Sequence, residues 1–246
     1  MLFLYNEIIY RPILNLLVLG YNYIPGHDVG VVIILVTILL RLILSPLFQK
    51  QIKSQQAMTA LQPQLLEVQK KYADDREGRA KAMMELYKEH KVNPLGSCLP
   101  LLIQLPILFA LYHVFMKALG GNLDGLYPWV VNPGRLDPMF LGLINLSKAS
   151  PALAILAGGL QFVQSRLMSK TQVVSMSGDS NDATAKALRF QTTYMLPLFS
   201  IAIAWKLPAG LPLYWSVTTI FAVLQQEWAN RKFKKKSTAT TIEHKK

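Results

Sequence analysis

The chain has 246 residues, of which 52% are apolar and 16% are charged, whereas soluble domains carry roughly 25% charged residues. Its net charge of +12 fits either a nucleic-acid-binding protein or a membrane protein. The placement of the charges distinguishes these two classes of protein. No charged side chain occurs in residues 92–116, 149–165, 190–205 and 207–226. Runs of this length approach the roughly 20 residues that cross a bilayer. The composition excludes an ordinary soluble domain and predicts a polytopic helical membrane protein.

The N-terminal segment, residues 1–28, is expected to form an amphipathic helix at the membrane interface. Glu7, Arg11 and Asn15 recur at i, i+4 and i+8, so they form a polar stripe on an otherwise apolar helix. A sixth, poor transmembrane span is the alternative, but Arg11-Pro12 fits badly within a bilayer. The segment lacks a basic n-region and a cleavage site, so we expect it to remain on the mature protein.

The later elements follow from the four charge-free runs, from a fifth apolar run at 29–48 that holds the single charge Arg41, and from the segments between them. We predict five transmembrane helices at 29–48, 93–117, 149–168, 190–206 and 207–228, a cytoplasmic helical hairpin at 49–92, an external loop at 118–148, a cytoplasmic loop at 169–189 and a basic cytoplasmic tail at 229–246. Segments 49–95, 166–189 and the tail hold 20 Lys and Arg residues, whereas the alternate loops hold four. An excess of basic residues marks the cytoplasmic side, so the N-terminus is predicted outside and the C-terminus in the cytoplasm.

The hairpin at 49–92 is predicted from a repeat of apolar residues. Met58, Leu61, Leu65, Val68 and Tyr72 alternate spacings of three and four, which is typical of a two-helix seam. A second pattern carries Ala80, Met83, Tyr87 and His90 after a turn near Asp74-Asp75. Pro63 should kink or restart the first helix, and Ser45-Pro46 and Asn93-Pro94 should break the chain from the spans. The alternative is a solvated connector.

Arg41 is the most informative residue, because a charged side chain inside a span usually faces a protein interior or a water-filled cavity. Thr37, Arg41 and Ser45 follow at i, i+4 and i+8 and give one helix face a polar character. The alternative is that Arg41 reaches along the helix to the membrane surface.

Other spans carry polar residues that match this face. They are Gln104 in the second span, Gln161 and Gln164 in the third, Thr192 and Ser200 in the fourth, and Ser216, Thr219 and Gln225 in the fifth. Together with Arg41 these residues would line a hydrophilic cavity, although each by itself also suits a contact between helices. Pro100 and Pro106 flank Gln104 and should bend its span. Trp205, Tyr214 and Trp215 are expected to form an outer aromatic belt.

Several function classes are disfavoured by residues that the sequence lacks. The five apolar runs contain no acidic residue, which argues against an ion-coupled transporter. There is no phosphate-binding loop, no metal-ligand spacing and a single cysteine, Cys98, which suits packing. We therefore expect no enzymatic activity, no cofactor and no metal.

The order of several motifs resembles the YidC/Oxa/Alb membrane-protein insertases. The motifs are VTILLRLILSPL at 36–47, YKEHKVNPLGSCLPLLIQLPILFALY at 87–112, LPAGLPLYW at 207–215 and LQQEW at 224–228, before a basic tail. The resemblance implies an all-α membrane protein with five transmembrane helices around a hydrophilic groove that opens to the cytoplasm. It also implies a bacterial plasma membrane and substrates that are nascent membrane proteins rather than small molecules.

The resemblance also implies roles for individual residues. Arg41 would attract acidic residues of a substrate tail in the groove, with Thr37, Ser45, Gln104, Gln161, Gln164, Trp215 and Ser216 lining it. Leu105 and Leu108 would form an apolar slide for the substrate helix. The basic residues of the tail, Arg231, Lys232, Lys234, Lys235 and Lys236, would contact membrane lipids or the ribosome, and the Sec translocon is a further expected partner. An anion channel or carrier and a structural assembly factor are the alternatives.

Overall fold

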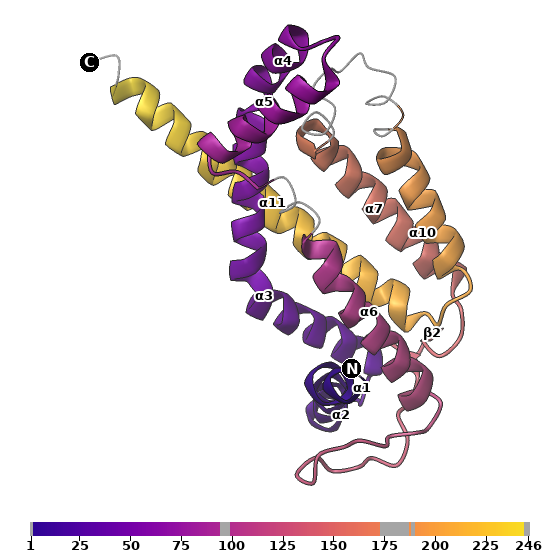
Figure 1. Ribbon diagram of the computed structural model, residues 1–246. Coiled ribbons are helices and arrows are strands. Elements are labelled where there is room, and N and C mark those ends of the chain that lie inside the picture. The colour runs from indigo at the N-terminus through magenta and orange to yellow at the C-terminus, as the bar shows by residue number, and fades with distance from the viewer. Residues whose placement is uncertain (1, 94–98, 173–186, 188–189, 244–246) are drawn as a thin grey trace. The chain divides into compact units, whose positions relative to one another are not determined.

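The computed structural model of the chain describes residues 2–93, 99–172, 187 and 190–243 (Figure 1). Most of the described residues are helical, which confirms the predicted class: α1 (Leu2–Tyr5), the π-helical turn η1 (Asn6–Tyr10), α2 (Arg11–Tyr23), α3 (Val29–Ala60), α4 (Gln62–Lys71), α5 (Arg76–Glu89), α6 (Leu99–Ala118), α7 (Pro151–Gln172), the π-helical turn η3 (Gln191–Met195), α10 (Leu196–Ala204) and α11 (Gly210–Glu243). Strands β1 (Met139–Phe140) and β2 (Ile144–Asn145) form a small antiparallel hairpin. The sequence did not predict this hairpin, which lies within the segment assigned to an external loop.

The chain divides into two compact units. Unit 1 consists of Met1–Ile43, Pro100–Phe162 and Leu196–Thr219, and unit 2 consists of Leu44–Leu99, Val163–Met195 and Ile220–Lys246. Most of the predicted cytoplasmic loop at 169–189 and the residue Cys98 lie outside the described residues.

Helix α3 is the one described helix that is long and apolar enough to cross a membrane by length and composition. Only 28% of its most apolar window is buried within the protein, so most of that surface is open to its surroundings. The other four predicted spans stay predictions.

Two π-helical turns arise from prolines in the sequence. The turn η1 ends two residues before Pro12, and η3 ends two residues before Pro197. A proline has no N–H to donate, and its ring crowds the carbonyl four residues earlier, so the preceding turn widens to hydrogen bonds that span five residues. The N–H of Arg11 accordingly donates to the carbonyl of Asn6.

The core of unit 1 gathers side chains from its N-terminal helices, α3, α6, α11 and the segment between α6 and α7. Its fully buried large residues include Leu14, Leu17, Val32, Phe115 and Leu146. Figure 1 shows the segment after α6 beside α1 and α2. Helix α2 is therefore held by protein contacts on its buried face.

The polar stripe of the N-terminal helices has partners in the segment after α6. Asn15 is 2% exposed; its Nδ2 donates to the carbonyls of Arg11 (2.7 Å) and Gly125 (3.1 Å), and its Oδ1 accepts from the N–H of Tyr127 (2.7 Å). Arg11 forms an ion pair with Glu7 at 2.7 Å and donates to the Gly125 carbonyl at 3.1 Å. Gly125 has a φ of 104°, which favours glycine there. The stripe thus holds the segment to α2, and the interfacial position of the helix stays a prediction.

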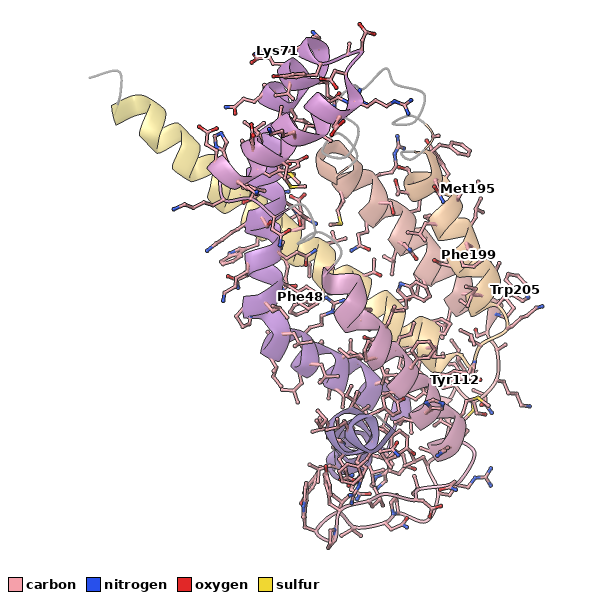
Figure 2. All side chains as sticks on the ribbon, in the orientation of Figure 1. Phe48, Lys71, Tyr112, Met195, Phe199 and Trp205 are labelled. Atoms are coloured by element: carbon pink, nitrogen blue, oxygen red, sulfur yellow. The ribbon has the colours of Figure 1, made fainter. Side chains whose placement is uncertain are left out.

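Close packing joins α7 to α10 within unit 1. A Cβ atom on Gly158 would meet the side chain of Ile201 and would lie 3.3 Å from the carbonyl oxygen of Pro197, whereas a Cβ on Gly159 would meet nothing within 4 Å. Phe199 on α10 and Trp205, which directly follows it, are both exposed (Figure 2). The small residue at 158 therefore allows the two helices to approach.

Gly158→Ala is expected to destabilise the protein, because the new methyl group needs Ile201 to move. The cost of overpacking is about 1–3 kcal/mol, although alanine favours a helix over glycine by about 1 kcal/mol. Gly159→Ala is the matched control and should be neutral or stabilising. The unfolding temperatures of both variants in detergent test this, and equal temperatures would contradict the packing argument.

In unit 2 the hairpin helices pack in part as the apolar repeat predicts, although Ala80 and His90 of the predicted second pattern are exposed. Met58, Leu61, Leu65 and Tyr87 form one buried cluster, with Met83 partly buried against it. Helix α4 begins at Gln62, which confirms the restart predicted at Pro63. The carboxylate of Asp75 accepts from the N–H of Gly78 and caps α5.

The expected break at Ser45-Pro46 is wrong. Helix α3 continues through Pro46 to Ala60. The missing N–H of a proline removes one hydrogen bond, which a long helix tolerates when the turns on both sides are well formed.

Alkaline pH is expected to weaken the hairpin through Tyr87. Burial raises the pKa of its hydroxyl above the ordinary value of 10.0. Below that value the hydroxyl is protonated in both folded and unfolded chains; above it the unfolded chain ionises first, so stability falls as pH rises. Limited proteolysis of the hairpin in the full chain should accelerate between about pH 10 and 11 more than in Tyr87→Phe. The same acceleration in both proteins would argue against a role for Tyr87.

Candidate functional site

The polar face of α3 in unit 1 is buried. Thr37 is 2% exposed and Arg41 is 8% exposed, whereas Leu42 and Ile43 are more than half exposed. The Thr37 hydroxyl donates to the carbonyl of Ile33 at 2.6 Å, within its own helix. The burial of Arg41 favours an interior position over one in which its side chain reaches the membrane surface.

Tyr214 on α11 interacts with Arg41 on α3 and with a side chain of α6. Gln104 on α6 donates from Nε2 to the hydroxyl oxygen of Tyr214 on α11 at 2.5 Å. The guanidinium of Arg41 lies close enough to Tyr214 for an electrostatic interaction. Helices α3, α6 and α11 therefore contribute to one largely buried polar group, which we call the Arg41 cluster: Arg41 and Tyr214, which are buried, and Gln104, which is half-buried.

Tyr214 belongs to the Arg41 cluster but was not predicted as a candidate site residue from the sequence. It was expected in an outer aromatic belt, but it is only 5% exposed. Tyr214 and Thr218 lie four residues apart on α11 and are both buried, so they share one face with a polar character. The four-residue spacing of Tyr214 and Thr218 could have indicated this polar face. The adjacent Trp215 instead favoured an aromatic belt.

The remaining predicted polar residues of unit 1 are buried or half-buried. Ser216 is 3% exposed, and its hydroxyl donates to the carbonyl of Pro212 at 2.8 Å within α11. Gln161 on α7 is 8% exposed, and its Oε1 has no hydrogen-bond partner among the described residues. Trp215 is half-buried. Thus Thr37 and Ser216 form hydrogen bonds within their own helices. The buried Oε1 of Gln161 has no partner among the described residues.

The predicted apolar slide lies on α6 in unit 1. Leu105 is 39% exposed, and Leu108 is partly buried against the core. The two residues are three positions apart and share a helix face.

Ser45 takes part in a second polar group, in unit 2. Its hydroxyl oxygen accepts from Nε2 of Gln225 at 3.0 Å and from Nε2 of Gln49 at 3.3 Å. These residues border a cavity of about 270 Å³ that is lined by Ser45, Gln49, Phe221, Leu224, Gln225 and Trp228. Gln164 also belongs to unit 2 and is half-buried. Gln49 was not predicted as a site residue from the sequence.

The basic tail continues helix α11. Its backbone is helical to Glu243, and Arg231 is exposed. The side chains of Lys232, Lys234, Lys235 and Lys236 lie outside the described residues.

The site has no metal-binding character within the part of the chain that the structure describes. No group of three or more His, Cys, Asp or Glu side chains among the described residues is arranged to hold a metal ion. The chemistry available is electrostatic attraction and hydrogen bonding, from the Arg41 guanidinium, amides and hydroxyls.

Comparison with known proteins gives one family. The family described as 60Kd inner membrane protein matches residues 21–236. The chain is 40% identical over 205 residues to the membrane protein insertase YidC of Fusobacterium nucleatum, which covers 82% of this chain and 86% of that protein.

Longer relatives match with similar identity. The chain is 34% identical over 224 residues to the membrane protein insertase YidC of Pelobacter propionicus, and 36% identical over 226 residues to that of Actinobacillus succinogenes. These alignments cover 91% and 92% of this chain but only 39% and 37% of the two relatives. The chain therefore spans less than half the length of these relatives. The resemblance drawn from the sequence motifs is confirmed.

Proposed function

Because the chain belongs to the 60Kd inner membrane protein family, we propose that it is a bacterial membrane protein insertase that receives nascent membrane proteins and releases their helices into the bilayer. The observation that carries the proposal is the buried Arg41 cluster on otherwise apolar helices. A buried cation is costly, so its presence in an apolar span calls for a functional reason.

We propose an architecture of five transmembrane helices around a hydrophilic groove that is open to the cytoplasm. Support comes from the helices α3, α6, α7, α10 and α11, each of which overlaps one predicted span. The N–H groups of Ala209 and Gly210 donate to the carbonyls of Lys148 and Leu146, which joins the α10–α11 turn to the end of the segment before α7. That contact agrees with both connections lying on one side of a membrane.

The groove would act by reducing the cost of moving polar chain through lipid. Polar groups buried without partners cost several kcal/mol in an apolar medium, and a hydrated cavity shortens the distance over which this cost applies. Arg41 would attract acidic residues of the substrate tail. The substrate helix would pass along Leu105 and Leu108 into lipid. No covalent step, nucleotide or cofactor is required.

Site-specific crosslinking tests the proposed path. A photoreactive residue at Leu105 or Trp215 should crosslink to the apolar helix of an inserting substrate, whereas one at Leu17, which is 1% exposed in the core, should not. Equal yields at all three positions would contradict a defined path.

An anion channel is the second candidate, since the buried Arg41 also suits anion binding. Chloride efflux from liposomes that contain the purified protein separates the two. Efflux without any insertion of a substrate would favour the channel.

We propose an orientation with the N-terminus outside and the C-terminus in the cytoplasm. The excess of basic residues in the segments 49–95, 166–189 and the tail supports it. The ribosome and the Sec translocon are proposed partners on the cytoplasmic side.

The basic tail is expected to bind ribosomes through phosphate contacts. It carries a net charge of +6 over the final 17 residues, so binding should fall steeply with salt. Deletion from Lys232 onward should weaken ribosome binding and leave insertion of substrates added after their synthesis intact. If the truncated and full chains bind translating ribosomes equally at physiological salt, the tail acts only as a lipid anchor.

A further inference from the structure

The β1–β2 hairpin in unit 1 exposes an apolar tip. Phe140 pairs with Ile144, and the three residues between them form the tip. Within it Leu141 is 63% exposed and Leu143 is 81% exposed. Two large apolar side chains therefore project from a short turn without burial against the rest of unit 1.

The backbone conformation of the tip disfavours leucine. The folding of the protein alone therefore does not explain why an exposed leucine stands there. Leu141 has a φ of 51° and Gly142 a φ of 68°, and the N–H of Leu143 donates to the carbonyl of Phe140 at 2.9 Å. Such a turn ordinarily takes Asn, Asp or Gly at its first central position. Leucine is strained in the left-handed region, and its exposed side chain recovers little of this strain energy within the protein. Contact with an apolar surface outside the protein would recover it.

The tip is fixed to the first turn of helix α3. The two carboxylate oxygens of Asp28 accept from the N–H groups of Val31, at 3.0 Å, and of Leu141. One side chain therefore caps the helix and holds the turn. The ring of Phe140 packs directly against Gly30, where a Cβ atom would clash with it.

Helix α3 identifies the surface that meets the tip. It is apolar and long enough to cross a membrane, and its exposed residues include Leu35, Leu39, Leu42 and Ile43. If α3 crosses a bilayer, lipid covers this face, and the bilayer boundary lies near the capped first turn. The exposed leucines of the tip sit at that turn, so they are continuous with the boundary of the lipid-covered region.

Other exposed aromatic and apolar side chains of unit 1 agree with a bilayer boundary near the first turn of α3. Tyr23 at the end of α2 is 81% exposed, and Val131 is 74% exposed; the carbonyl of Val131 accepts from Asn22 at 2.7 Å. Trp129 is 66% exposed and stacks on Tyr127. Tyrosine and tryptophan are enriched where a membrane meets water.

We propose that the β1–β2 hairpin is a membrane-surface anchor, in which Leu141 and Leu143 insert into the lipid leaflet at the end of α3 that Asp28 caps. The anchor fixes the depth of α3. Arg41 follows Asp28 by 13 residues, or about 20 Å of helix, so the hairpin also fixes the depth of Arg41. The proposal rests on α3 crossing the membrane, as in the proposed function, and not on insertase activity.

Fluorescence quenching in lipid tests the anchor. An environment-sensitive label is attached to Leu143→Cys in the full chain with Cys98→Ser, reconstituted in phosphatidylcholine vesicles. Its emission should shift to the blue and be quenched by lipids that carry a nitroxide near the top of the acyl chain. Ser147→Cys is the control, because Ser147 is exposed in the same segment and polar; its label should be quenched by iodide in the water.

Each other outcome contradicts the proposal. Equal iodide quenching at both positions would place the tip in water, and protection from iodide without quenching by the lipids would indicate a protein partner. A further variant separates the anchor from folding. Leu141→Asn suits the positive φ, so its unfolding temperature in detergent should be unchanged or higher, while lipid quenching at position 143 should fall about twofold. Unchanged quenching in this variant would overturn the role of Leu141. None of these measurements depends on substrate insertion. The anchor can therefore be tested even if the proposed insertase function is wrong.

Discussion

Replacing Arg41 with alanine is expected to reduce insertion of substrates with acidic tails by about tenfold, which corresponds to about 1.4 kcal/mol of lost attraction. Arg41 is buried beside Tyr214, where a single charge acts at a low effective dielectric constant. Substrates with neutral tails should lose less. Insertion yields for a matched series of tails, differing only in the number of acidic residues, measure the effect.

Arg41→Lys separates charge from shape in this test. Lysine keeps the positive charge but not the planar guanidinium, so this variant should retain most of the activity. Leu42→Ala is the matched control on the same helix, because Leu42 is 56% exposed and lies on another face. Equal insertion by Arg41→Ala across all tail charges would remove Arg41 from the mechanism.

Asn15→Leu is expected to destabilise the protein by about 2–4 kcal/mol, or roughly 5–10 °C in unfolding temperature. The change removes three hydrogen bonds and leaves the part-buried N–H of Tyr127 without the acceptor it has now. The unfolding temperature of the purified protein in detergent measures the loss.

Asn22→Leu is the comparison for Asn15. Asn22 makes one hydrogen bond, to the carbonyl of Val131, in an exposed setting. Water replaces such a bond at little cost, so this variant should lose less than about 1 kcal/mol. If both variants unfold at the same temperature, the contacts of Asn15 do not hold the segment after α6.

Features that depend on neighbouring residues were predictable from the sequence. The charge-free runs marked the apolar helices, and the spacing of Met58, Leu61 and Leu65 marked the seam with Tyr87. Pro63 marked the start of α4. Each signal lies within one or two helical turns, where periodicity and proline geometry determine the outcome.

Features that depend on distant contacts were not predictable. The partner of Asn15 is Gly125, 110 residues away, and the partner of Gln104 is Tyr214, also 110 residues away. A polar stripe tells only that a helix face needs polar partners. The stripe does not tell whether lipid headgroups, water or another protein segment supplies these polar partners. A helix at the membrane interface and a helix packed against another segment therefore have the same sequence pattern.

The candidate site shows the same division. The i, i+4, i+8 pattern of Thr37, Arg41 and Ser45 predicted a polar helix face, and Thr37 and Arg41 are buried. The bond from Gln225 to Ser45 crosses 180 residues and has no local signal. Tyr214 was hidden because a tyrosine next to a tryptophan suits an aromatic belt as well as a buried site.

Insertion by the purified chain tests the central claim most directly. The protein is reconstituted in liposomes, and a short single-span substrate with an acidic tail is added after its synthesis, without nucleotide. The proposed function predicts a protease-protected substrate fragment that appears with the chain and falls by about tenfold with Arg41→Ala. The same amount of protected fragment in liposomes with and without the chain would contradict it.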